Sequence, residues 1–141
     1  MREILFRGKR LYNGEWAEGY YAAEPYTKNT YNCGYILENE KDLFAKRACI
    51  VDSRTVGQFT GLTDKNGKKI FEGDILKIYE GSEDDGYKIR KVYSYGGVLC
   101  VDYETSEWDF NALAFLDSDN VFTFEVIGNI YDNPELLEVT E

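Results

Sequence analysis

Short apolar segments separated by glycine-containing turns recur along most of this 141-residue sequence, and they constrain its fold more than any other feature. The densest example is VGQFTGLTDKNGKKIFEGDIL, residues 56–76, which contains four glycines and three carboxylates. Segments of strand length bounded by turn residues are typical of antiparallel sheets. The sequence therefore predicts a mainly β protein: a small antiparallel barrel or sandwich with SH3-like barrel elements and one or two short helices.

The N-terminal part is predicted to begin with a hairpin. In RLYNGEWAEGYYA, Asn13 and Gly14 suit the two central positions of a type I′ turn, because both positions need positive φ. Residues 20–33 are polar and aromatic and are expected to form a loop. The runs GYILE, residues 34–38, and ACIVD, residues 48–52, have the length of strands and are separated by the charged NEKDLFAK.

The central part alternates turns and strands. DKNG and EGD have turn chemistry, in which Asn and Gly tolerate positive φ, so KKIF and ILKIY are expected to be strands. The acidic EGSEDDG, residues 80–86, should be an exposed hairpin loop. YKIRKVYSY, residues 87–95, alternates as one strand, and after Gly96-Gly97 the run VLCVDY suits a buried strand.

The C-terminal part contains the helical candidates. SEWDFNALAFL, residues 106–116, is predicted to form a short helix with Trp108, Ala112 and Phe115 on one side. NVFTFEVIG is a last strand whose core side carries Phe122, Phe124 and Val126. In NPELLEVTE, Asn133 is expected to cap one helical turn that has Pro134 at its first position.

Length and composition favour a single domain over residues 1–141, with an N-terminal hairpin or subdomain 1–50 and a barrel 51–141 as the alternative division. Hydrophobic residues make up 43% of the chain, enough for a core without disulfides or metal. Cys33, Cys49 and Cys100 lack metal-site spacing and are expected to be reduced, with Cys100 in the core. No apolar run suits a signal peptide or membrane span, so a cytoplasmic location is expected.

The charge pattern narrows the functional classes. The net charge of −10, from 26 acidic and 16 basic residues, argues against direct binding to nucleic acid, which needs a basic surface. An acidic surface either keeps the protein soluble or meets a basic partner. The sequence contains no histidine, which removes the commonest general base and every Ser-His or Cys-His catalytic pair.

The glycine-rich stretch does not match a known ligand loop. Asp64 and Asn66 resemble the start of an EF-hand loop, but Lys69 stands where that loop needs glycine. The glycine spacing matches neither dinucleotide-binding nor P-loop patterns. Glu72 and Asp74 could share a strand face, but Gly73 between them favours a turn. We therefore assign no catalytic, cofactor-binding or metal-binding residues from the sequence and expect no cofactor.

Three blocks of this sequence, in this order, are MREILFRGKRLYNGEWAEGYY, DSRTVGQFTGLTDKNGKKIFEGDIL and FEVIGNIYDNPELLE. Together they resemble the YopX family of bacteriophage and prophage proteins. The resemblance implies a small, mainly β protein of the bacterial cytoplasm that forms homo-oligomers and whose molecular function is unassigned. The family offers no accepted catalytic residues to carry over. Matched positions include Thr55, Gly57, Gly61, Asp64, Gly67, Glu72, Gly73, Asp74, Gly128, Asn129, Asn133 and Pro134.

Three functional hypotheses follow. The first is a non-catalytic protein-binding or assembly module whose partner is itself or a host or phage protein, with the tyrosine-rich N-terminal third as contact surface. The second is a Mg²⁺-dependent enzyme acting on phosphates through Asp52, Asp64, Glu72 or Asp74. The third is an acidic nucleic-acid mimic that regulates a host DNA-binding protein. From the acidic charge and the lack of an apolar span, we expect no direct nucleic-acid binding and no membrane insertion.

Overall fold

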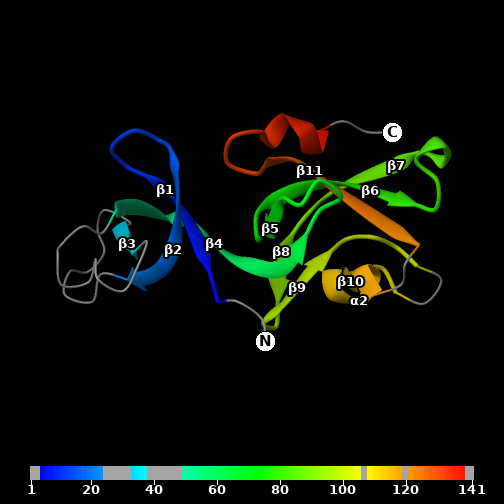
Figure 1. The fold of residues 1–141 in the computed structure, drawn as a ribbon, viewed down its shortest axis with the longest axis horizontal. Helices are drawn as coiled ribbons and strands as arrows, with labels where there is room; N and C mark the ends of the chain where they lie inside the picture. Colours follow the sequence, from blue (N-terminus) through cyan, green and yellow to red (C-terminus); the bar gives the residue numbers. More distant parts are fainter. Residues whose placement is uncertain (1–3, 24–32, 38–48, 106–107, 119–120, 139–141) are drawn as a thin grey trace. The chain divides into compact units, whose positions relative to one another are not determined.

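The computed structural model describes residues 4–23, 33–37, 49–105, 108–118 and 121–138 (Figure 1). Antiparallel strands dominate these residues, together with the short helix α2 (Leu113–Ser118) and the 3-10 turns η1 (Glu83–Asp85) and η2 (Pro134–Glu138). The predicted mainly β class, a small barrel or sandwich with short helical elements, is confirmed. The chain divides into two compact units, Met1–Phe59 and Thr60–Glu141. The expectation of one domain and that of SH3-like elements stay predictions.

The first unit is a ring of four strands, β1 (Phe6–Arg10), β2 (Trp16–Ala23), β3 (Cys33–Leu37) and the first part of β4 (Cys49–Thr63). β1 pairs with β2 and β4, and β3 pairs with β2 and β4, so the ring closes. Buried Ala17, Ile36 and Val51 fill its centre. At Gly8 a Cβ atom would stand only 2.8 Å from the Val51 side chain, so glycine permits this close packing.

The predicted N-terminal hairpin is present, but its predicted turn is wrong. The Arg10 N–H donates to the Glu15 carbonyl at 2.8 Å, so the loop comprises residues 11–14 and is wider than a two-residue turn. The Gly14 N–H returns to the Arg10 carbonyl at 2.9 Å with a φ of 75°. The Asn13 side chain accepts from the Glu15 N–H at 3.0 Å, and this local bond stabilises the wider loop.

The predicted loop over residues 20–33 is also too long. β2 continues to Ala23, and Tyr20–Ala23 pairs with β3, which already begins at Cys33. Phe6 and Tyr21 rings lie 6.0 Å apart, so packing against a neighbouring strand decides the conformation of these aromatic residues. Residues 24–32 of that predicted loop, and the segment NEKDLFAK, lie outside the described residues.

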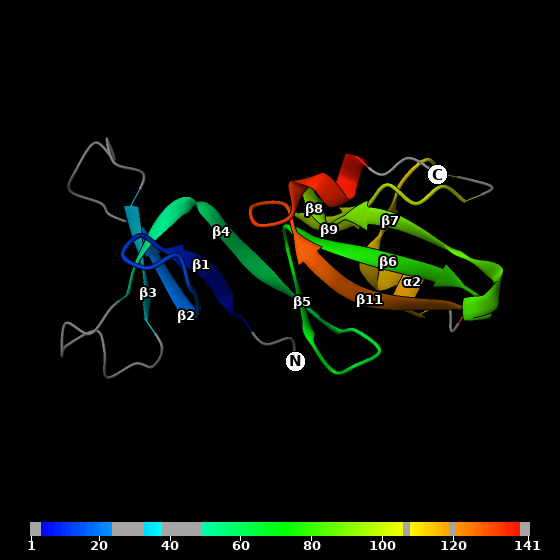
Figure 2. The ribbon, with the colours of Figure 1, turned by 90° about the horizontal axis from the view of Figure 1, so that it is seen from above.

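The second unit contains two three-stranded sheets and a hairpin. The hairpin joins the end of β4 to β5 (Lys69–Phe71). One sheet has the order β11-β6-β7, with β6 (Asp74–Glu80), β7 (Tyr87–Lys91) and β11 (Phe122–Asn129), and Figure 2 shows these strands side by side. The other has the order β10-β9-β8, with β8 (Tyr93–Tyr95), β9 (Val98–Val101) and β10 (Asn111–Ala112). The core consists of Ile70, Leu76, Ile78, Val92, Val101, Tyr103, Leu113, Leu116 and Phe124.

The segment YKIRKVYSY, predicted as one strand, is divided between the two sheets at Val92. Val92 is 1% exposed and belongs to the core. Its N–H donates to the Asp74 carbonyl and its carbonyl accepts from the Gly73 N–H, each at 2.9 Å. These bonds satisfy the backbone where the chain leaves β7 for β8, so the strand can break without losing its hydrogen bonds.

The helix prediction over residues 106–116 is partly wrong. α2 begins only at Leu113, after β10, and it buries Leu113 and Leu116. Trp108 and Phe115, which were expected on one side of the helix, are 62% and 58% exposed, and Trp108 lies outside α2. The single turn η2 follows Asn133 as predicted, but the Asn133 side chain accepts from the Asn129 N–H at 3.2 Å. It therefore closes the turn before η2.

Several other expectations are confirmed. Phe124 is buried, and Phe122 and Val126 pack against the same core. Gly96 and Gly97 join β8 to β9 with φ of 59° and 83°, the pair of positive values that a type I′ turn requires. Residues 81–86 form the exposed loop between β6 and β7, and Glu80, the first residue of the predicted loop, ends β6. No helix among the described residues has the length and apolarity to cross a membrane.

Candidate functional site

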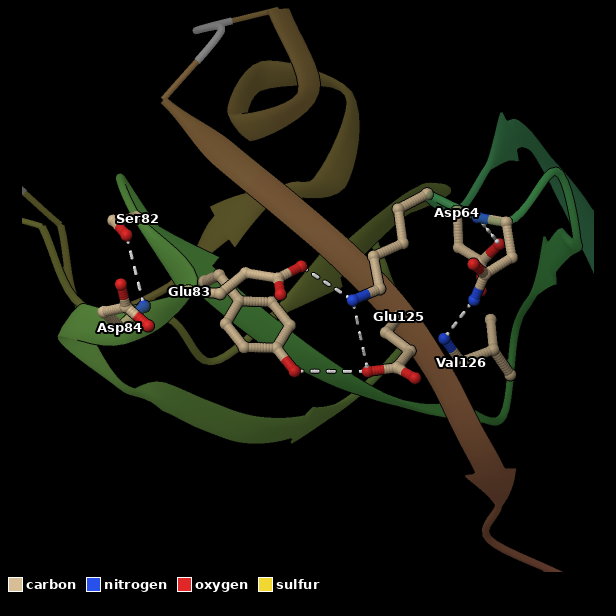
Figure 3. A network of polar contacts seen from close by, with 9 residues as sticks. Asp64, Ser82, Glu83, Asp84, Glu125 and Val126 are labelled. Carbon is tan, nitrogen blue, oxygen red and sulfur yellow. Dashed lines mark hydrogen bonds and ion pairs between the residues drawn. The ribbon is translucent and has the colours of Figure 1, made fainter.

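Asp64 is the first carboxylate of the glycine-rich stretch, and its side chain accepts hydrogen bonds from three backbone N–H groups. It is buried, and its Oδ1 accepts from the N–H groups of Asn66 and Lys68 at 2.9 Å. Its Oδ2 accepts from the Val126 N–H of β11, also at 2.9 Å (Figure 3). Burial favours a higher pKa, but the three backbone donors outweigh it and lower the pKa of Asp64. The turn interpretation of Asp64 is confirmed.

Two other carboxylates of the enzyme hypothesis, Asp74 and Asp52, also have structural contacts. Asp74 is 1% exposed, and its Oδ2 accepts from the Phe71 N–H at 2.7 Å across the turn that contains Glu72. Asp52, in the first unit, lies 2.9 Å from Arg54 Nη2, and this hydrogen bond lowers the pKa of Asp52. Asp64 and Asp74 therefore stabilise two different turns.

A polar network covers the outer side of the β11-β6-β7 sheet (Figure 3). Lys65 Nζ lies 2.7 Å from Glu83 Oε1 and 3.8 Å from Glu125 Oε1. The Tyr79 hydroxyl donates to Glu125 at 3.2 Å, and Lys65 Nζ lies 5.1 Å from the Tyr79 ring centroid. The hydrogen bond to Glu83 raises the pKa of Lys65. The network joins the 64–67 turn to the acidic loop and to β11.

A pocket of about 350 Å³ opens where β6, η1 and β7 meet. In the strand register Ile78 pairs with Lys88, and Glu80 is two residues beyond Ile78, so these three side chains share one side of the sheet. The chain after β9 adds Tyr103. The lining residues are Ile78, Glu80, Asp85, Gly86, Tyr87, Lys88 and Tyr103.

Tyr103 forms the buried wall of this pocket. It is 4% exposed, and its hydroxyl donates to Glu80 Oε2 at 2.8 Å. The Phe122 ring meets it edge-on at a centroid distance of 5.2 Å, and Lys88 Nζ lies 4.8 Å from its centroid. Burial and the bond to Glu80 raise the pKa of Tyr103 to about 12. The ring is therefore neutral near neutral pH and lies beside one carboxylate and one ammonium group.

The pocket residues differ from those that the sequence suggested. Asp52, Asp64, Glu72 and Asp74 are absent from its lining, and sequence reasoning missed Tyr103 and Lys88. The alternation of residues 87–91 places Lys88 on one side of a strand, but only the fold brings Tyr103 to it. Within the described ranges, no three metal-ligating side chains gather as a metal site. The pocket's carboxylates, ring and ammonium can bind a polar or charged group.

The outer side of the β10-β9-β8 sheet carries a second surface feature, which we call the aromatic face and define as Tyr95, Val98 and Phe110. Tyr95 and Val98 are cross-strand partners, 64% and 50% exposed. Phe110, 38% exposed, meets Tyr95 edge-on at a centroid distance of 5.4 Å. Three large side chains thus form a continuous exposed apolar surface.

The profile of the YopX protein family matches residues 5–138. The chain belongs to the YopX family. Among solved structures, protein EF1440 from Enterococcus faecalis is 25% identical over 97% of this chain and 99% of its own, with a TM-score of 0.55. The YopX protein of Bacillus subtilis is 18% identical over 100% of both chains, with a TM-score of 0.59, and shares the fold. No curated protein matches this sequence.

Proposed function

We propose that this YopX-family protein is a non-catalytic protein-binding or assembly module, encoded by a phage or prophage and acting in the cytoplasm of the bacterial host. The observation that carries the proposal is the aromatic face, Tyr95, Val98 and Phe110. Aromatic residues are enriched where proteins contact each other, because their large apolar area is released from water there. Contiguous exposed apolar surface is a marker of such contacts.

The roles of the carboxylates support the same proposal. The enzyme hypothesis uses Asp52, Asp64, Glu72 or Asp74 with Mg²⁺, and two of these side chains, Asp64 and Asp74, accept hydrogen bonds from turn backbone. Binding a cation through them would compete with these bonds. Asp64 and Asp74 stabilise turns, and the aromatic face is exposed. Together these observations favour contact with a protein, and we propose a second copy of this chain as the partner.

Self-association of the full chain tests the proposal. Sedimentation velocity over a range of concentrations should show an oligomer that dissociates on dilution. The double variant Tyr95→Ser/Phe110→Ser should be monomeric at the same concentrations. Tyr12→Ser separates the aromatic face from the tyrosine-rich N-terminal third, because Tyr12 is 92% exposed and lies in the first unit, and this variant should associate like the wild type. A wild-type chain that stays monomeric at every concentration would contradict self-assembly.

The acidic loop favours one second candidate, the nucleic-acid mimic. Glu83, Asp84 and Asp85 are consecutive and exposed, on a chain with a net charge of −10. A mimic would capture a basic DNA-binding protein from host lysate in low salt and release it as salt screens the charges. Mass spectrometry of the eluted proteins identifies the partner, and capture that persists in high salt would exclude mimicry.

A further inference from the structure

We propose that the pocket between β6, η1 and β7 binds a basic side chain, a lysine ammonium or an arginine guanidinium, presented by a partner polypeptide. The inference rests on the proposed binding role and specifies the chemistry that the partner must offer. It is carried by the size of the pocket, the charge of its lining and the aromatic wall that Tyr103 provides.

The size of the pocket suits one side chain. Its volume of about 350 Å³ lies near the lower end of small-ligand sites, which begin at roughly 300 Å³. Ile78, the cross-strand partner of Lys88, is fully buried in this structure and can contact the methylene groups of a long basic side chain once Lys88 has moved. A large cofactor would not fit within this volume.

The charge of the pocket favours a cation. Two carboxylates, Glu80 and Asp85, line it together with one ammonium group, Lys88. The adjoining Glu83 and Asp84 add negative charge on the exposed loop. A phosphate or carboxylate ligand would meet net repulsion here. The loop acids can also accept hydrogen bonds from backbone N–H groups beside the bound side chain, which favours a basic polypeptide over a free amine.

The pocket already contains a cation in the expected position. Lys88 Nζ lies 4.8 Å from the Tyr103 ring centroid, within the roughly 6 Å of a cation–π contact. Phe122 and Glu80 hold that ring in place. We infer that an incoming basic group pairs with Glu80 and Asp85 and displaces Lys88 from the ring. Lys88 thus acts as an internal competitor for the site.

Titration of the ¹⁵N-labelled full chain tests this inference. The probes are the tripeptides acetyl-Gly-Lys-Gly-amide and acetyl-Gly-Arg-Gly-amide, with norleucine in place of the basic residue as the neutral control and butylammonium as the free amine. The basic peptides should shift the amide signals of Gly86, Tyr87 and Lys88. The norleucine peptide should leave them unchanged, and butylammonium should bind more weakly than the lysine peptide. Butylammonium binding as tightly would overturn the polypeptide assignment.

Two pairs of variants with equal charge changes sharpen the test. Asp85→Asn should weaken binding of the basic peptides about two- to fivefold, whereas its neighbour Asp84→Asn, outside the pocket lining, should have a smaller effect. Lys88→Gln should tighten binding about two- to fivefold by removing the competitor. Lys77→Gln is its control, because Lys77 lies over the Tyr87 ring at 4.5 Å and does not line the pocket.

Equal effects within either pair, or equal shifts with the norleucine peptide, would overturn the pocket assignment. The result is distinguishable from that of the self-association experiment. A monomeric chain that binds the basic peptides contradicts only the assembly proposal. An oligomeric chain whose pocket signals do not respond to them contradicts only the present inference.

Discussion

A single carboxylate, Asp64, stabilises contacts between distant parts of the second unit. Asp64 accepts three backbone hydrogen bonds and joins a turn to β11, although the two partners are 62 residues apart in sequence. A carboxylate has two oxygens with several lone pairs and no donor, so it suits a site where only N–H groups point inward. This requirement explains an acid at this position without any catalytic role.

Replacing Asp64 by Asn should lower the free energy of unfolding by about 1–3 kcal/mol, because the amide turns one acceptor into a donor that faces a backbone N–H. Urea unfolding measures the change. Asp84→Asn, on the exposed loop, is the control and should change stability by less than about 0.5 kcal/mol. A similar small loss for both variants would contradict the structural role of Asp64.

The stability difference between the wild type and Asp64→Asn should depend on pH. The pKa of Asp64 is below its ordinary 3.8 in the folded protein, so its contribution to stability is complete above pH 3.8 and is lost as pH falls through the folded value. The stability difference between wild type and Asp64→Asn should therefore be largest near neutral pH and shrink in acid. Unfolding curves in acid and near neutral pH would show it.

The half-buried Tyr93 and the buried Tyr103 should affect stability at alkaline pH. Burial, with hydrogen bonds to Asp102 and Glu80 respectively, raises the pKa values of Tyr93 and Tyr103 from 10.0 to about 12. Their contributions are complete below pH 10 and are lost as pH rises from there through about 12. Phe at either position should reduce the loss of stability over this range, whereas Tyr12→Phe should not. Thermal unfolding at several pH values measures the slopes.

At the scale of elements, packing decides which side of a segment is buried. The pattern of residues 106–116 indicated a helix with Trp108, Ala112 and Phe115 on one side, but α2 turns Leu113 and Leu116 into the core. Short segments carry too few turns for periodicity to define a buried side. Asn111 contributes another tertiary constraint, because its side chain donates to the Tyr103 carbonyl at 2.8 Å and holds β10 in place.

Substitutions at two adjacent positions of α2 should show which side of this helix is buried. Leu116→Ala removes a fully buried side chain and should cost about 2–5 kcal/mol of unfolding free energy, from lost burial and the cavity it leaves. Phe115→Ala removes a larger side chain that is 58% exposed and should cost less than about 0.5 kcal/mol. Denaturant unfolding of both variants measures the contrast, and the reverse order would refute the placement of α2.

At the scale of the whole molecule, the chain has two hydrophobic clusters that belong to different compact units. Ala17, Ile36 and Val51 form the centre of the first unit, and the larger cluster around Leu76 and Phe124 forms that of the second. β4 runs from the first unit into the second, so the boundary between the two units lies within a strand and not in a loop. Separate cores predict separable local stabilities.

Hydrogen exchange of core variants should reveal these stabilities. Val51→Ala should accelerate amide exchange in β1, β2 and β3 and leave β6 and β11 close to wild type, because Val51 packs only in the first cluster. Leu76→Ala should have the opposite effect. Equal acceleration in both units for either variant would show that the chain unfolds as one cooperative domain.

The sequence alone determined the features that depend on neighbouring residues. The glycine turns of the second unit, the exposed acidic loop, the last strand with Phe122 and Phe124 inward, and the turn chemistry of Asp64 were predictable, because positive φ, alternation and side-chain-to-backbone bonds act over a few residues. The blocks that resemble the YopX family lie largely in these segments.

Only the tertiary structure decided the features that join distant segments. The break at Val92 depends on backbone bonds to residues 73 and 74, and the pocket depends on Tyr103 reaching Glu80 and Lys88. The aromatic face likewise needs Phe110 beside Tyr95. Such contacts are selected by packing and burial of the whole unit, and local sequence patterns do not encode which distant side chains will meet.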